Sequence, residues 1–204
     1  MRCGLALSLT LVCVQARAND FRNVNWGMAK AQVLAAESNK PANVRETNGE
    51  VVVEYDLLQY GNLATSVIYI FAKEKLVRAK YLFEMEHREL NDFIADFKRI
   101  EPLLQEQYGK PSSERAIWAD DATQLEPKSY LDQDRATPSS ILVSDANVGL
   151  AVSLGHLRLF AQWDGVRTKV MHALSGENNR IVHQIEYRSV ELEALENSAR
   201  SAKP

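Results

Sequence analysis

Residues 157–188 read LRLFAQWDGVRTKVMHALSGENNRIVHQIEYR, and this stretch decides the fold. Apolar and polar side chains alternate over 157–163, 166–174 and 180–188, as is typical of strands with one buried and one solvated face. Asp164-Gly165 is a strong signal for a two-residue hairpin turn, and Ser175 to Asn179 fits a looser turn. The stretch therefore predicts three antiparallel strands.

The same alternation appears earlier in the chain. It predicts three strands over 51–58, 63–73 and 76–84, joined by tight turns at Gly61-Asn62 and Glu74-Lys75, and a further short strand that ends at Trp118. Helices are predicted over 28–38, 88–108 and 141–154, the second with an apolar stripe and a break near Pro102. The pattern indicates an α+β fold in which helices pack on one face of antiparallel sheet.

A weak internal repeat is visible at two dipeptides. Lys40-Pro41 and Lys110-Pro111 each follow a predicted helix and precede predicted strands. This spacing indicates two related halves, each built as a helix and then strands.

The N-terminus has the three parts of a secretory signal, namely Arg2, the apolar run Leu5 to Val14, and Ala16-Arg17-Ala18. The apolar run is about half of the roughly 20 residues that a membrane span needs. We therefore expect a signal peptide over 1–18, a single domain over 19–190 and a flexible tail over 191–204. The expected location is periplasmic or secreted, without membrane insertion after cleavage. Lipid attachment at Cys13 is the less favoured alternative, because Val12 precedes it where a small residue is usual.

Composition excludes several classes of function. Both cysteines, Cys3 and Cys13, lie in the predicted signal, so the exported part has no thiol chemistry. The chain carries 24 Lys and Arg against 27 Asp and Glu, a net charge of −3, and has no basic cluster. Nucleic acid is therefore not an expected partner, because phosphate-backbone binding needs concentrated positive charge.

His172 and His183 are the only candidate metal ligands that the sequence brings together. They face each other if Leu174 lies opposite Ile181, and zinc would be the natural occupant. However, no third ligand is predicted, and both histidines share the apolar parity of their strands. We favour a structural pair and expect neither a metal nor a cofactor.

A binding surface is the remaining candidate site. Trp26, Trp118 and Trp163 each stand beside a turn or strand end, where an aromatic residue is either a core anchor or a partner contact. Asp120 and Asp121 open a polar segment over 119–140 of the kind that carries functional loops. These five residues are the predicted surface.

Three motifs carry a resemblance to known proteins. They are Phe21-x-x-Val24-x-Trp26-Gly27-Met28, Tyr108-Gly109-Lys110-Pro111 and Trp163…Thr168…Ile185-x-Tyr187, and they resemble a group of uncharacterised exported bacterial proteins. The Gly27-Met28-Ala29 start is also similar to that of the outer-membrane assembly lipoprotein BamE (SmpA/OmlA) and of β-lactamase inhibitor proteins. Those proteins pair helices with one face of an antiparallel sheet and bind other proteins. The resemblance implies a non-enzymatic module that binds an envelope protein. The alternative is a periplasmic hydrolase that uses residues of the 119–140 segment and the final sheet.

Overall fold

The computed structural model describes residues 19–47, 49–119 and 147–201. Its helices are α1 (Lys30–Ala36), α2 (Leu90–Tyr108), α4 (Val148–Ser153) and α5 (Glu193–Ser201). Its strands are β1 (Asn43–Thr47), β2 (Glu50–Tyr60), β3 (Leu63–Ala72), β4 (Lys75–Phe83), β5 (Ser113–Trp118), β6 (Leu157–Asp164), β7 (Thr168–Glu177) and β8 (Arg180–Ser189). A mixed α and β fold dominated by antiparallel sheet is thus confirmed.

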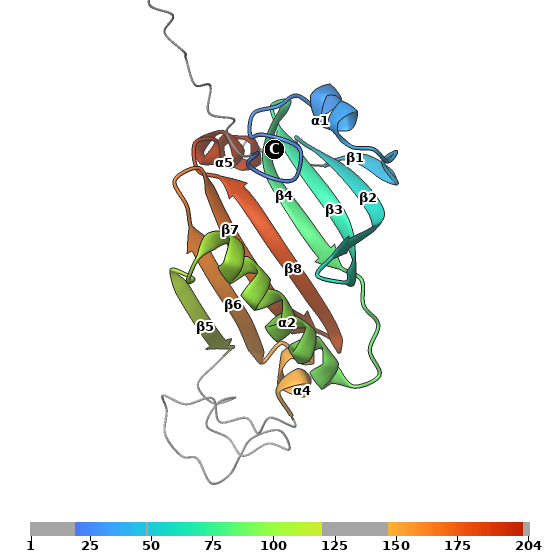
Figure 1. Cartoon of the computed structure of the whole chain (residues 1–204), viewed down its shortest axis with the longest axis vertical. Helices are drawn as coiled ribbons and strands as arrows, with labels where there is room; N and C mark the ends of the chain where they lie inside the picture. Colours follow the sequence, from blue (N-terminus) through green and yellow to red (C-terminus); the bar gives the residue numbers. More distant parts are fainter. Residues whose placement is uncertain (1–18, 48, 120–146, 202–204) are drawn as a thin grey trace, which may run out of the picture.

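The described strands form one sheet of eight, in the order β1-β2-β3-β4-β8-β7-β6-β5 (Figure 1). Each pair of neighbours is antiparallel. Strands β1 to β4 follow α1 in the chain, and strands β5 to β8 follow α2. The last strand of each group, β4 and β8, meet in the middle, so β1 and β5 are the two edges.

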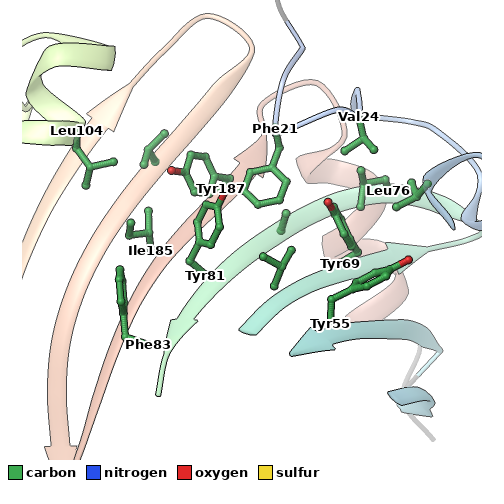
Figure 2. Packing of buried hydrophobic residues seen from close by; sticks show 14 of the residues in the cluster. Phe21, Val24, Tyr55, Tyr69, Leu76, Tyr81, Phe83, Leu104, Ile185 and Tyr187 are labelled. Carbon is green, nitrogen blue, oxygen red and sulfur yellow. The ribbon is translucent and has the colours of Figure 1, made fainter. Parts of the chain in front are cut away.

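One face of the sheet carries the main core (Figure 2). The N-terminal segment lies on this face, where Phe21 packs on Tyr69, Tyr81 and Tyr187 with ring centroids 4.8 to 5.6 Å apart. Helix α2 covers the same face over β6 to β8 (Figure 1) and buries one stripe of its surface: Ile94, Phe97, Ile100 and Leu104.

The predicted break near Pro102 is not found, because α2 runs unbroken from Leu90 to Tyr108. Proline removes one backbone donor from a helix and crowds the preceding turn. Ile100 and Leu104 flank Pro102 and are both fully buried, so packing on the sheet stabilises the helix on either side of that defect.

Helix α5 lies on the opposite face, which corrects the prediction that all helices share one face. Its Ala199 packs with Ala72 and Val77. The residues that precede these two in their strands, Phe71 and Leu76, belong to the main core, so Ala72 and Val77 point to the other face of the sheet. The segment 191–204, which we expected to be flexible, thus contains a helix docked on the sheet.

The hairpin turns differ from the prediction at three places. The turn predicted at Glu74-Lys75 lies at Lys73-Glu74, because Ala72 pairs with Lys75. Asn178 and Asn179 form a two-residue turn with φ of 52° and 64°, between the paired residues Glu177 and Arg180. Asparagine tolerates this left-handed conformation better than most residues. The turn predicted to be tight, at Asp164-Gly165, is instead longer, because Asp164 pairs with Lys169.

Candidate binding surface

The uncovered face of β5 to β8 is the candidate site. In these strands, every second side chain points to the face covered by α2 and α4. Leu157, Leu174 and Ile185 are examples. The side chains between them point to the opposite face. Helix α5 lies on that face, but it docks on residues of β3 and β4. Most of the face of β5 to β8 opposite α2 therefore has no described helix over it.

Apolar side chains form the floor of this face. Phe160 lies opposite Ala173, and the next pair on this face of the same two strands joins Gln162 to Met171. Ile117 at the edge strand and Val182 on β8 extend the apolar surface, with 44% and 36% of their areas exposed. Together these side chains line a shallow hollow of about 830 Å³.

Arginine side chains border the hollow. Arg158 on β6 and Arg180 on β8 are exposed and line it, as does the acidic Glu177. Arg115 on β5 lies on the same face, opposite Phe160. Among the residues that the structure describes, no carboxylate is found within ion-pair distance of Arg115, Arg158 or Arg180.

A second, smaller hollow of about 340 Å³ continues the surface toward α5. Gln162 and Met171 line both hollows, and Glu193 of α5 closes the far end. Charges are balanced here, because Lys169 pairs with Glu193 and Arg188 pairs with the buried Glu186. The unbalanced positive charge therefore belongs to the first hollow.

The predicted tryptophans do not gather into a surface. Trp163 is only 3% exposed and its Nε1 donates to the Gly109 carbonyl at 2.8 Å, so it is a core anchor. Trp26 is half-buried against the core and donates to the Thr168 hydroxyl at 2.8 Å. Trp118 is half-buried beneath the other end of α2.

Two further parts of the prediction lie outside the described residues. These are Asp120 and Asp121, and residues 120–140 of the 119–140 segment that the hydrolase alternative used together with the final sheet. The hollow on β5 to β8 was missed because strand positions of solvated parity were assumed to be polar. Phe160, Met171 and Val182 break that rule, and they are the signal that could have identified this face.

His172 and His183 do meet, but in the core. Their Nε2 atoms are 2.8 Å apart, so one ring donates a hydrogen bond to the other. His172 stacks on Phe97 and His183 stacks on Phe83, each with ring centroids 4.0 Å apart. Burial lowers the pKa of His172 to about 2, with a further contribution from His183, and burial lowers that of His183 to about 3. Burial thus favours the neutral form of both rings.

The predicted register of the two histidines is wrong by two residues. His172 lies opposite Ile185, and Leu174 lies opposite His183, so the rings meet diagonally. The tight Asn178-Asn179 turn fixes this register, because the length of a hairpin loop sets the pairing of its strands.

One group of acids has the donor type that hard cations prefer. Carboxylate oxygens of Glu54, Asp56 and Glu84 lie within 4.8 Å of one another. The Ser66 hydroxyl is 3.0 Å from Asp56 and also contacts Glu84, while Arg45 pairs with Glu54 at 3.2 Å. Protein groups therefore already satisfy part of this cluster.

Two further titratable pairs attach α2 to its surroundings. Burial, reinforced by the neighbouring Glu114 of β5, raises the pKa of Glu101 to about 7. His87, which precedes α2, contacts the buried carboxylate of Asp96 at 2.6 Å. Neither pair lines the hollow on β5 to β8, so neither supplies chemistry to that face.

Comparison with known proteins gives no relative for this geometry, since no family model, curated protein or solved structure matches the chain. None of the described helices has both the length and the apolar character that crossing a bilayer requires.

Proposed function

We propose that this protein is a non-enzymatic binding module of the bacterial cell envelope, and that the face of β5 to β8 opposite α2 binds a partner protein. The predicted signal over 1–18 supports an envelope location. The predicted resemblance to exported binding proteins supports the class of function.

The observation that carries the proposal is the apolar floor of a sheet face over which no described helix lies. A solvated strand face normally bears polar side chains. Here Phe160, Met171, Ile117 and Val182 line one hollow instead. Contiguous apolar surface of this kind marks interaction sites more often than isolated exposed residues do.

The arrangement of the chain supports two related halves. Lys40-Pro41 follows α1 and ends two residues before β1, and Lys110-Pro111 follows α2 and ends two residues before β5. Among the described residues, a helix docks on the outer face of the first half only, and the proposed site lies on the outer face of the second half.

Substitution in the floor tests the proposal. A tagged full-length protein with Phe160→Asp and Met171→Asp should fail to retain envelope proteins that the unsubstituted protein retains, because two carboxylates would be desolvated in the contact. The comparison is affinity capture from an envelope extract, read by quantitative mass spectrometry.

Val166→Asp is the matched control, because Val166 is 95% exposed at the turn between β6 and β7 and does not line the hollow. It should retain the same proteins as the unsubstituted chain. If the floor variant, shown to be folded by circular dichroism, also retained them, the face would not be the binding surface.

A further inference from the structure

The charge around the hollow identifies the chemistry of the partner. Resting on the proposed function, we propose that the face of β5 to β8 binds an acidic, aliphatic segment of a partner protein. Its carboxylates would pair with Arg158 and Arg180, and its apolar side chains would cover Phe160 and Met171.

The arrangement of the arginines supports this assignment. Arg158 on β6 and Arg180 on β8 flank the end of β7, where Ser175 and Glu177 also line the hollow. Glu177 lies opposite Arg180 in the sheet but forms no ion pair with it. The lining therefore keeps an excess of positive charge.

The positive charge of this hollow contrasts with the charge of the rest of the molecule. The whole chain has a net charge of −3. Arg78 and Arg188, which are buried or half-buried on the same face of the described sheet, are both paired. Arg78 contacts three carboxylates and Arg188 contacts Glu186. Arg115, opposite Phe160, adds a third exposed guanidinium next to the floor. A partner that brings carboxylates meets complementary charge here, which favours both its encounter and its specificity.

The apolar floor separates this partner from a phosphate polymer. Nucleic-acid binding requires a concentrated basic surface, and single strands bind through several stacked aromatic rings. The hollow offers one aromatic ring, Phe160, among aliphatic and amide side chains. Aliphatic side chains that alternate with carboxylates match both the floor and its border.

Fluorescence anisotropy with synthetic peptides tests the inference on the full chain. The probe is a fluorescein-labelled octapeptide of alternating Leu and Glu at nanomolar concentration, compared with Leu-Lys and Ser-Glu octapeptides. We expect the Leu-Glu peptide to bind at least ten-fold more tightly than either of the others, and its affinity to fall as salt is raised from 50 to 300 mM.

Charge reversal provides the sharper readout. The double variant Arg158→Glu/Arg180→Glu should prefer the Leu-Lys peptide to the Leu-Glu peptide. Lys30→Glu/Lys110→Glu changes the net charge equally at exposed positions outside the hollow and should keep the original preference. Equal affinity for all three peptides, or a preference unchanged by Arg158→Glu/Arg180→Glu, would overturn the inference.

Three further results would do the same. Displacement of the peptide by single-stranded DNA or polyphosphate would assign the arginines to phosphate. A dimer in sedimentation that dissociates on Phe160→Asp would assign the face to a second copy. Loss of captured protein with Phe160→Asp, without any peptide charge preference, would leave the binding module standing and reject the acidic segment alone.

Discussion

At the scale of single residues, the core contains two histidines that hydrogen-bond to each other. Each ring is stacked on a phenylalanine, and His172 is completely buried. A proton added to either ring would place a charge in a medium that solvates charge poorly, and a proton on the acceptor Nε2 would also break the hydrogen bond between the rings. The pair therefore links the stability of the fold to pH.

Acid should destabilise the protein through this pair. Both folded pKa values are lowered, so below about pH 6.5 the unfolded chain binds protons that the folded chain refuses. We expect the pair to reduce the free energy of unfolding by up to about 2.7 kcal/mol for each pH unit between 6.5 and 4.5. Stability from the pair is thus fully present above pH 6.5 and lost as the pH falls.

Urea unfolding of the wild type and of His172→Leu/His183→Leu at pH 7.5, 6.5, 5.5 and 4.5 measures this effect. The two curves of unfolding free energy against pH should diverge below pH 6.5, with the wild type falling more steeply. Parallel curves would show that the histidines do not stay neutral in the folded state.

The strand parity of these histidines could be predicted from the sequence, but their partners could not. Alternation assigned both to the buried face. Their register depended on which residues occupy the turn, and Asn178-Asn179 is a weaker signal than the Asp164-Gly165 pair that attracted the prediction. The register of the strands decides which residues a buried side chain such as His172 contacts, and the residues next to it in the sequence do not.

At the scale of elements, α5 is attached to the sheet by charge as well as by apolar contact. Arg78 of β4 is buried and meets Glu196 of α5 at 3.0 Å, with Glu50 and Glu186 at 3.6 and 3.7 Å. Segment 191–204 looked flexible because it is short, charged and poor in large apolar residues. The buried arginine that makes Glu196 an interior residue lies more than a hundred residues away, which no local pattern reveals.

Removing Arg78 should therefore cost more than removing a surface arginine. Arg78→Met leaves three carboxylates without their shared partner, and breaking a buried ion pair typically costs about 3 to 5 kcal/mol. Arg45→Met, which removes an exposed pair with Glu54, should cost about 1 kcal/mol or less. Chemical denaturation of both variants at pH 7.5 gives the comparison, and equal losses would contradict a central role for Arg78.

At the scale of the whole molecule, the two groups of four strands share one interior. Phe21, Tyr69 and Tyr81 come from the first group or its leading segment, and Ile185 and Tyr187 come from β8, yet all belong to one cluster (Figure 2). Alternation and turn residues were enough to predict seven of the eight described strands, while the two related halves indicated by the Lys-Pro dipeptides stay a prediction. The same signals could not predict β1, whose side chains at 43–46 are exposed, or that β4 would pair with β8.

Because the interior is shared, unfolding should occur in a single transition. Trp26→Phe/Trp118→Phe keeps Trp163 as a reporter of the second half. Trp118→Phe/Trp163→Phe keeps Trp26, which reports the contact between the N-terminal segment and Thr168 of β7. In each variant, the fluorescence midpoint in urea should coincide with that of far-ultraviolet circular dichroism. A fluorescence midpoint well below the dichroism midpoint in either variant would mean that the region around the remaining tryptophan opens independently.

The position of β8 also has a consequence for biosynthesis. This strand is the last of the described eight in chain order, yet it lies at the centre of the sheet between β4 and β7. A polypeptide that emerges N-terminus first, from a ribosome or a translocation pore, can form its earlier hairpins but cannot join them until residues 180–189 have appeared. Closure of the sheet is therefore a late event in the life of each new chain, and until then the edge of β4 stays open to other strands.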